Sequence, residues 1–332
     1  MPKPITIQDV ARAAGTSAST VSRVLTGSAP VSPQKRAAVE EAIQRMGFRP
    51  SHVARSLRTR TTHSIGLLIN DVTNPFYSAV AKGVEDEARR HGYSLILCNT
   101  SEDPERELEY LHILLDKQVD GIIFGPIGEN VEFIRALAHR IPLVQVDRRL
   151  EGVEIETVMA DNEGGACRAT RLLLERGHHR IGVMTWSAQI MVLSQRVAGY
   201  QRALAEANQP LDPALIAEVP RFNPRLIVEA AAHLLMTQRP TALFALNNQL
   251  GLGALRAIRD LGLRIPDDVA LIVFDDLEVF DLMTPRITAV EQPAMTMGQR
   301  AVQLLVGRIE GQAERPPQVA ILPTQLVLRE SV

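Results

Sequence analysis

Several aromatic, basic and acidic side chains in the later part of the chain stand where short apolar runs end. A small polar ligand needs such a mixture, because aromatic faces can enclose it while a few polar groups orient it. Structural alternatives exist, since Arg148 could form a surface ion pair, Phe222 could lie in the core and Asp275 could cap a helix. The candidate ligand-binding residues are Phe76, Tyr77, Arg148, Arg196, Phe222, Asn248 and Asp275.

Common enzyme motifs are missing from the sequence. It contains no GxSxG elbow, no phosphate-binding P-loop and no CxxC pair. His178 and His179 are adjacent, which is too close for two metal ligands one helical turn apart, and Asp275-Asp276 has no neighbouring cluster of ligands. We therefore expect no catalytic residues, no metal and no cofactor, and we predict that the protein is not an enzyme.

The elements that must position the candidates alternate regularly from residue 64 onward. Apolar runs such as SIGLLI, YSLILC, GIIFG, PLVQVD, RIGVMT, TALFAL and VALIVF indicate buried strands. Such alternation predicts an α/β fold of parallel sheets flanked by helices, and ligands bind such sheets at the carboxyl ends of the strands. Two series of this kind fit two lobes better than one sheet. Helical patterns lie between the runs, at 75–91, 103–118, 162–177, 194–207, 225–237, 248–262 and 294–310.

Charge is distributed unevenly along the 332 residues, although the net charge is only -2. Residues 1–62 hold ten basic and three acidic side chains, a formal charge of +7, and the rest holds 26 basic and 35 acidic, or -9. A basic first segment on an acidic body indicates a polyanionic partner for that segment alone.

Residues 6–25 predict two short helices joined by a tight turn. Thr6 can cap the first helix, with Asp9 as the reciprocal acid of a capping box. Gly15 suits the left-handed turn, and Ser17 can cap the second helix. A third helix is expected from Ser32-Pro33 to Gly47. These patterns predict a three-helix unit that begins with a helix-turn-helix.

DNA is the partner that this unit suits. Its second helix would enter the major groove, where Arg23 can bond guanine O6 and N7 together, whereas Ser19 and Ser22 can make only single bonds. Any helical hairpin has similar spacing, but the charge of +7 favours DNA. The candidate DNA-binding residues are Thr6, Ser17, Ala18, Ser19, Ser22 and Arg23.

The following stretch, 49–62, has the sequence RPSHVARSLRTRTT. Its apolar and basic residues permit a helix of about two turns, which is marginal alone in water. It could be a flexible basic linker, or it could fold on DNA and insert Leu57 between base steps of the minor groove. We include Ala54, Arg55 and Leu57 among the candidate DNA contacts.

The matching segments TVSRVL, VARSL, SIGLLINDVTNPF, RGHHRIGVM, IPDDVALIVFDD and ITAVEQP occur in one order between residue 6 and about residue 329. In this the chain resembles the lactose-repressor/purine-repressor (LacI) family of bacterial transcription regulators. The resemblance implies a helix-turn-helix domain at 1–48, a hinge helix at 49–62 and a two-lobed, periplasmic-binding-protein-like effector domain at 63–332, with chain crossings near 160 and 290. It also implies effector contacts at Phe76, Arg148, Arg196, Phe222 and Asp275.

Two segments depart from the family pattern. Ile190, Met191, Val192 and Leu193 stand where relatives usually place polar or basic residues, and Asn247-Asn248 stands where Asn-Asp is frequent. The apolar segment suits a ligand with one apolar edge. It could instead pack in the core, or mark a pocket that has lost its ligand.

The resemblance and the residues together predict a cytoplasmic, ligand-responsive repressor that binds double-stranded operator DNA as a homodimer. A sugar or sugar derivative is expected as effector because such effectors prevail in the family. The alternatives are a solute-binding transport protein, which the basic first segment and the missing signal peptide disfavour, and a regulator controlled by a phosphoprotein. The chain ends soon after QLVLRE without a leucine heptad tail, which favours a dimer over a tetramer. No apolar run reaches the roughly 18 residues that cross a membrane, and Cys98 and Cys167 are expected to be buried free thiols.

Overall fold

The computed structural model describes residues 5–26, 29–48, 61–187, 190–220, 223–312 and 315–332. The chain forms two compact units, Met1–Thr62 and His63–Val332, called here the head and the body.

The head contains the three helices that the sequence predicts: α1 (Ile7–Ala13), α2 (Ala18–Thr26) and α3 (Pro33–Met46). Thr6 and Asp9 form the capping box of α1, and the Ser17 hydroxyl accepts a hydrogen bond from the Thr20 amide at the start of α2. Gly47 ends α3 in the left-handed conformation. The small core joins all three helices through Val10, Ala11, Val21, Val39, Ala42 and Phe48.

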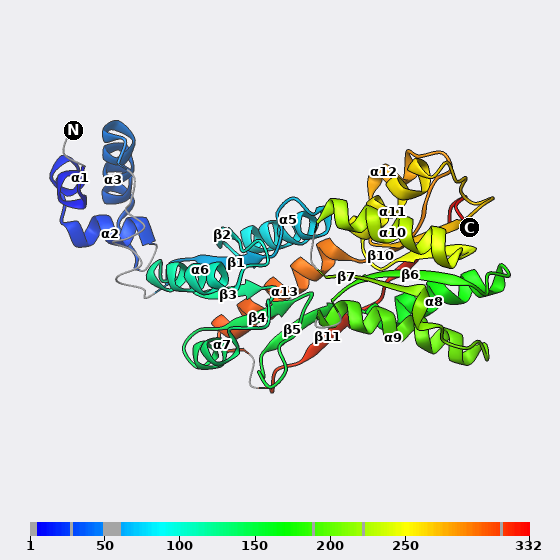
Figure 1. Ribbon diagram of the computed structural model, residues 1–332. Coiled ribbons are helices and arrows are strands. Elements are labelled where there is room, and N and C mark those ends of the chain that lie inside the picture. The colour runs from blue at the N-terminus through cyan, green and yellow to red at the C-terminus, as the bar shows by residue number, and fades with distance from the viewer. Residues whose placement is uncertain (1–4, 27–28, 49–60, 188–189, 221–222, 313–314) are drawn as a thin grey trace. The chain divides into compact units, whose positions relative to one another are not determined.

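The body contains two six-stranded sheets (Figure 1). The first has the order β11-β5-β4-β3-β1-β2 and the second the order β12-β10-β9-β8-β6-β7. Strand for strand the two orders match, so the two lobes repeat one topology. All pairs are parallel except β10 with β12. The strands are β1 (Ser64–Ile69), β2 (Ser94–Asn99), β3 (Gly121–Phe124), β4 (Leu143–Val146), β5 (Glu156–Ala160), β6 (Ile181–Trp186), β7 (Ile216–Val219), β8 (Ala242–Ala245), β9 (Ala270–Phe274), β10 (Thr288–Glu291), β11 (Val319–Leu322) and β12 (Gln325–Val327).

Helices cover both faces of each sheet, as expected for parallel strands that are buried on both sides. In the first lobe, α5 (Pro75–Arg90) and α13 (Ala294–Ile309) pack on one face, and α6 (Pro104–Asp116) and α7 (Val131–Ala138) on the other. In the second, α8 (Asn162–Glu175) and α9 (Met191–Glu206) cover one face, and α10 (Pro224–Gln238) and α11 (Asn248–Asp260) the other. Two short helices, η1 (Pro213–Leu215) and α12 (Glu278–Asp281), complete the body. These layers confirm the predicted α/β class.

Three segments connect the lobes. The chain crosses after β5 and after β10, close to the two expected positions, and crosses again between β11 and β12. The third crossing was missed because β11 is an edge strand of only four residues, VAIL, and so short an apolar run does not by itself identify a strand. The helix that carries Arg196 also begins three residues earlier than the expected residue 194, at Met191.

Glycine permits close packing of helices at equivalent places in the two lobes. A Cβ added to Gly298 of α13 would clash with the backbone oxygen of Val80 in α5, and one added to Gly199 of α9 would clash with that of Glu163 in α8. These obstacles are backbone atoms, which a side-chain rotation cannot move. Gly307, also in α13, has open space around an added Cβ.

Gly298→Ala should lower the free energy of unfolding of the body by about 1–3 kcal/mol, because overpacking forces α5 and α13 apart. Gly307→Ala is the matched control and should be neutral or stabilising by up to about 1 kcal/mol, because alanine favours a helix more than glycine does. Urea denaturation of both variants measures the difference. Equal stabilities would show that α5 and α13 can separate freely.

Candidate ligand-binding cleft

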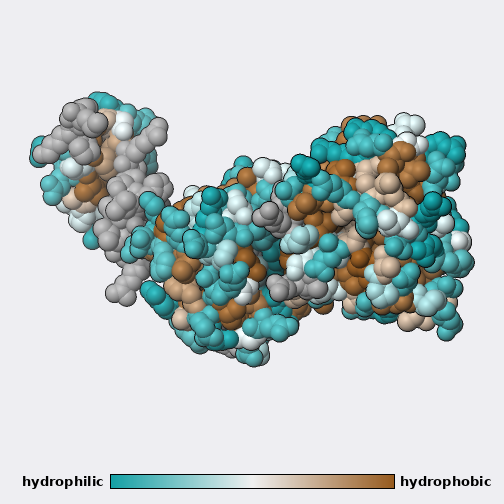
Figure 2. All heavy atoms as spheres, in the orientation of Figure 1, coloured by the Kyte–Doolittle hydropathy of each residue, from teal (hydrophilic) through white to brown (hydrophobic). Residues whose placement is uncertain are grey.

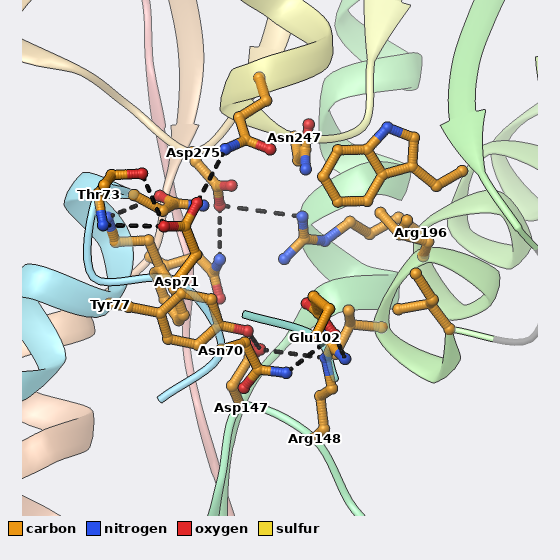
Figure 3. Close-up of a pocket in the computed structure, with 18 of the residues that line it drawn as sticks. Asn70, Asp71, Thr73, Tyr77, Glu102, Asp147, Arg148, Arg196, Asn247 and Asp275 are labelled. Carbon is orange, nitrogen blue, oxygen red and sulfur yellow. Dashed lines mark hydrogen bonds and ion pairs between the residues drawn. The ribbon is translucent and has the colours of Figure 1, made fainter. Parts of the chain in front are cut away.

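A cavity of about 460 Å³ lies between the two lobes of the body, at the carboxyl ends of their strands (Figure 3). This volume falls within the range of roughly 300–1,000 Å³ that is usual for small-molecule sites. Each lobe supplies about half of the wall. The first lobe contributes Asn70, Asp71, Thr73, Asn74, Phe76, Tyr77, Ser101, Glu102, Asp147 and Arg148, and the second contributes Trp186, Ile190, Val192, Leu193, Arg196, Asn247, Gln249, Asp275 and Gln292.

The structure brings most of the predicted ligand-binding residues together. Phe76, Tyr77, Arg148, Arg196 and Asp275 all line the cavity. Asn248 lies beside it, while its neighbour Asn247 faces it. Phe222 lies outside the described residues.

Arg196 and Asp275 form the buried polar centre of the second lobe. Arg196 is 3% exposed; its Nε donates to Asn162 Oδ1 at 2.9 Å and its Nη1 to the backbone oxygen of Leu246 at 2.7 Å. Nη1 also lies 3.9 Å from Asp275 Oδ1, and the guanidinium sits 3.7 Å above the Phe274 ring. Burial lowers the pKa of Arg196, and the charge of Asp275 opposes that effect. A charge that is buried but paired in this way can be retained in the interior.

Asp147 occupies in the first lobe the place that Asp275 occupies in the second. Asp147 directly follows β4 with φ +68°, and Asp275 directly follows β9 with φ +73°. The Tyr77 hydroxyl donates to Asp147 Oδ2 at 2.9 Å, and the Gln292 amide donates to Asp275 Oδ1 at 2.5 Å. Burial raises the pKa of Asp147, against the opposing effect of Arg148. Burial also raises the pKa of Tyr77, and the negative charge of Asp147 raises it further.

Arg148 is bound by a carboxylate that the sequence did not reveal. Its Nη1 and Nη2 donate to the two oxygens of Glu102 at 2.9 and 2.6 Å, and Asn70 Nδ2 donates to Glu102 Oε2 at 3.1 Å. Burial lowers the pKa of Arg148, but Tyr77 and then Glu102 outweigh it, so the pKa is raised. Glu102 lies in the loop after β2 with φ +58°. A short acidic loop carries no sequence signal for such a contact.

One side of the cavity is apolar. Trp186, Ile190, Val192 and Leu193 line it, and Val192 and Leu193 also belong to the core of the second lobe. Met191 packs against that core without lining the cavity. The segment that departs from the family pattern therefore combines core packing with an apolar wall.

Direct bonds join the lobes at the cavity. Asn248 Nδ2 donates to Asn74 Oδ1 at 2.8 Å, and Gln249 Nε2 donates to Asp71 Oδ2 at 3.3 Å. Asn74 also caps α5, since its Oδ1 accepts the Phe76 amide at 3.0 Å. These bonds hold the first turns of α5 and α11 together.

In the head, most candidate DNA contacts are accessible. Thr6, Ser17, Ser19 and Arg23 are exposed, and Ser22 is half-buried. Ala18 is half-buried and packs against the head core. It opens α2 directly after the turn from α1, where the helices approach each other. Ala54, Arg55 and Leu57 lie outside the described residues.

Other observations concern metals, thiols and membranes. Within the described ranges, no group of three His, Cys, Asp or Glu side chains could hold a metal ion. Cys98 and Cys167 are buried free thiols, as predicted. Of the helices in those ranges, none has the length and apolarity that crossing a bilayer requires.

Comparison with known proteins identifies both units. Residues 6–51 match the lacI family of bacterial regulatory proteins, and residues 170–332 match a periplasmic binding protein-like domain. The HTH-type transcriptional repressor PurR of Vibrio atlanticus is 34% identical over 98% of each chain, and the ribose operon repressor of Haemophilus influenzae is 35% identical over 98% of each. The lac repressor dimer bound to operator and the anti-inducer ONPF superposes with a TM-score of 0.89 at 25% identity, covering 99% of each chain.

These relatives span the head and the body alike; the first matched range lies in the helix-turn-helix head and the second covers the later part of the two-lobed body. The chain therefore belongs to the lacI family of bacterial regulatory proteins, as a DNA-binding transcriptional repressor rather than an enzyme.

Proposed function

We propose that this repressor senses a sugar or sugar derivative in the cleft and passes the signal to operator DNA bound by the head. The observation that carries the proposal is the cleft wall, which places buried polar groups such as Arg196 and Asp275 opposite aromatic and aliphatic side chains. A sugar matches that wall, since its hydroxyls need polar partners and its C–H faces need apolar ones. The similar ribose operon repressor makes ribose the first compound to test.

Linkage explains how the cleft controls the head. A ligand can shift the DNA-binding equilibrium only through unequal affinity for two conformations. The two lobes both supply cleft residues, so a bound sugar favours one relative position of the lobes over others. Effector contacts in this proposal are Phe76, Tyr77, Arg148, Arg196 and Asp275, together with Phe222, whereas Asn248 acts beside the cleft through its bond to Asn74.

The head would read the operator through α2, with Arg23 as the main base contact. Arg23→Ala should weaken binding to the cognate operator by about 1–3 kcal/mol and relax discrimination at one position, because a bidentate contact to guanine is lost. Titrations against cognate and scrambled duplexes, at one fixed salt concentration, measure both effects. Arg12→Ala is the control, since Arg12 is an exposed cation on α1 that pairs with Asp9. Equal losses on both duplexes would show that Arg23 contacts only phosphate.

Arg196 tests the effector site. Arg196→Ala should leave operator affinity near normal. It should abolish the response to effector, because the buried groups that Arg196 bonds in the site are left without their partner, at a cost of about 1–3 kcal/mol. A thermal-shift screen of neutral sugars, sugar phosphates and nucleosides on the full chain first identifies the effector. Operator titrations with and without it then compare the wild type, Arg196→Ala and the control Arg202→Ala.

Arg202 lies on the same helix but pairs with Glu163 at the surface, so its removal should preserve the response. If Arg196→Ala still responds fully, the effector binds elsewhere and the pair with Asp275 is structural. If no sugar acts and another class of compound does, the proposed effector class is wrong.

We also propose that the chain works in the cytoplasm as a homodimer on a near-palindromic operator, because two-fold symmetry in the protein matches two half-sites. The similarity to the lac repressor dimer supports this. Figure 2 shows hydrophobic residues among the hydrophilic ones on the surface of the body. Exposed apolar side chains on the second lobe, such as Met236 and Leu282, supply surface that a second copy could cover. Analytical ultracentrifugation should find a species of twice the 36.5 kDa chain mass, and a monomer that binds operator at full affinity would contradict the proposal.

A further inference from the structure

The charged side chains of the cavity wall are unequal in number. Among the described lining residues, the acids are Asp71, Glu102, Asp147 and Asp275, and the bases are Arg148 and Arg196. Acids therefore exceed bases by two. An anion that entered this cavity would lie among carboxylates at short range, and its binding would be opposed electrostatically.

Arg148, the cation best suited to bind an anion, is already occupied. A phosphate or carboxylate is bound most strongly by two parallel N–H groups of one guanidinium. Both terminal nitrogens of Arg148 donate instead to Glu102, at 2.6 and 2.9 Å, and Figure 3 shows the two side chains directed at each other. Only 10% of the Arg148 side chain is exposed. Glu102 thus takes the place that an anionic group of a ligand would need.

Arg196 is also poorly suited to bind an anion. Its Nε and Nη1 donate to Asn162 and Leu246, so Nη2 alone remains for a ligand within the described part of the chain. Its two N–H groups can orient hydroxyls, but they lie on one nitrogen and cannot form the two parallel bonds, one from each of two nitrogens, that give Arg its strength toward anions.

Several other polar atoms of the wall accept hydrogen bonds. Carboxylate oxygens of Asp71 and Glu102 face the cavity from the first lobe. Among the described residues, two buried amide oxygens of the wall, Asn70 Oδ1 and Gln292 Oε1, have no hydrogen-bond partner, and neither has the buried Nε of Arg148. Acceptors need a ligand with donors, and buried ones left unpaired are costly. Hydroxyl groups donate, whereas an ionised phosphate or carboxylate mainly accepts.

We propose that the cleft selects an uncharged polyhydroxy ligand and rejects its phosphorylated and carboxylated forms, and that Glu102 sets this specificity by occupying Arg148. The inference rests on the proposed function, because it concerns the effector of the same cleft. The apolar wall of Trp186, Ile190 and Val192 faces the C–H side of such a ligand.

The first experiment compares neutral sugars with their charged forms on the full-length chain. Isothermal titration calorimetry measures D-ribose against D-ribose 5-phosphate, and D-glucose against D-glucose 6-phosphate and D-gluconate. The neutral member that binds should bind at least tenfold more tightly than its charged forms. If a charged form binds equally well or better, and Arg148→Ala weakens it, the inference is overturned while an effector site for sugar derivatives in the cleft still stands.

The second experiment needs no known effector. Glu102→Ala frees both terminal nitrogens of Arg148, so sulfate should raise the melting temperature of this variant more than that of the wild type. The double variant Glu102→Ala/Arg148→Ala should lose the gain. Glu105→Ala is the matched control, since Glu105 is an exposed acid of the same lobe outside the cavity.

Sulfate bound to the basic head raises all four melting temperatures alike and cancels in the comparison. An absent gain in folded Glu102→Ala, or a gain that survives removal of Arg148, would overturn the role of Glu102. The melting curve without sulfate shows whether each variant is folded. The proposed function fails by a different result, namely an effector response that persists in Arg196→Ala.

Discussion

The cleft depends on the pairing of charges that the fold buries at the ends of two equivalent strands. Asp147 after β4 and Asp275 after β9 both have left-handed backbone, and each receives a hydrogen bond from a buried side chain. A charge without a partner at such depth would be neutralised or would destabilise the fold. The arginines near the two aspartates therefore stabilise the protein itself before any ligand arrives. Residues that a ligand contacts are also residues that hold each lobe together.

This double role explains why the two arginines differ. Arg196 is fixed by Asn162, Leu246 and the Phe274 ring, all in its own lobe, so it is a rigid group with one nitrogen left to donate. Arg148 is fixed by Glu102, whose side chain is 39% exposed and comes from a loop. Arg196 and the groups that fix it therefore resemble a permanent part of the core. Arg148 can exchange its partner more easily, because the solvated carboxylate of Glu102 loses less interaction free energy when it moves away. Glu102 is thus the point where a substitution changes what the cleft accepts without dismantling the lobe.

The sequence predicted what depends on local chemistry and missed what depends on distant contacts. The capping box at Thr6, the turn at Gly15 and the helix end at Gly47 follow from rules that act over a few residues. Buried parallel strands that are continuous apolar runs, such as β3, β8 and β9, were also predictable, whereas β5 and β10 contain polar residues and were not predicted. β11 was not predicted, since its apolar run VAIL is only four residues long and does not by itself identify a strand.

The candidate site shows the same division. Arg196 and Asp275 could be predicted because they follow buried strands, whose carboxyl ends meet in the cleft. Glu102 could not, because its contact with Arg148 joins two loops 46 residues apart and requires φ +58° at a residue other than glycine. Asn248 was expected at the ligand, yet the first turn of α11 directs it toward Asn74 in the other lobe and leaves Asn247 at the cavity. A shift of one residue along a helix start is beyond the resolution of a sequence pattern.

The contact of Asn248 with Asn74 bears on how a ligand can act. Together with the bond from Gln249 to Asp71, it joins the lobes beside the cavity. Each such bond contributes roughly 0.5–1.5 kcal/mol, which is comparable to the free energies that separate conformations in regulatory proteins. A ligand that bonds Asp71 competes with Gln249 for the same carboxylate, whereas one that rests on Trp186 and Val192 adds to the existing contacts between lobes. The sign of the response therefore depends on where along the cleft the ligand places its hydroxyls, and not only on how tightly it binds.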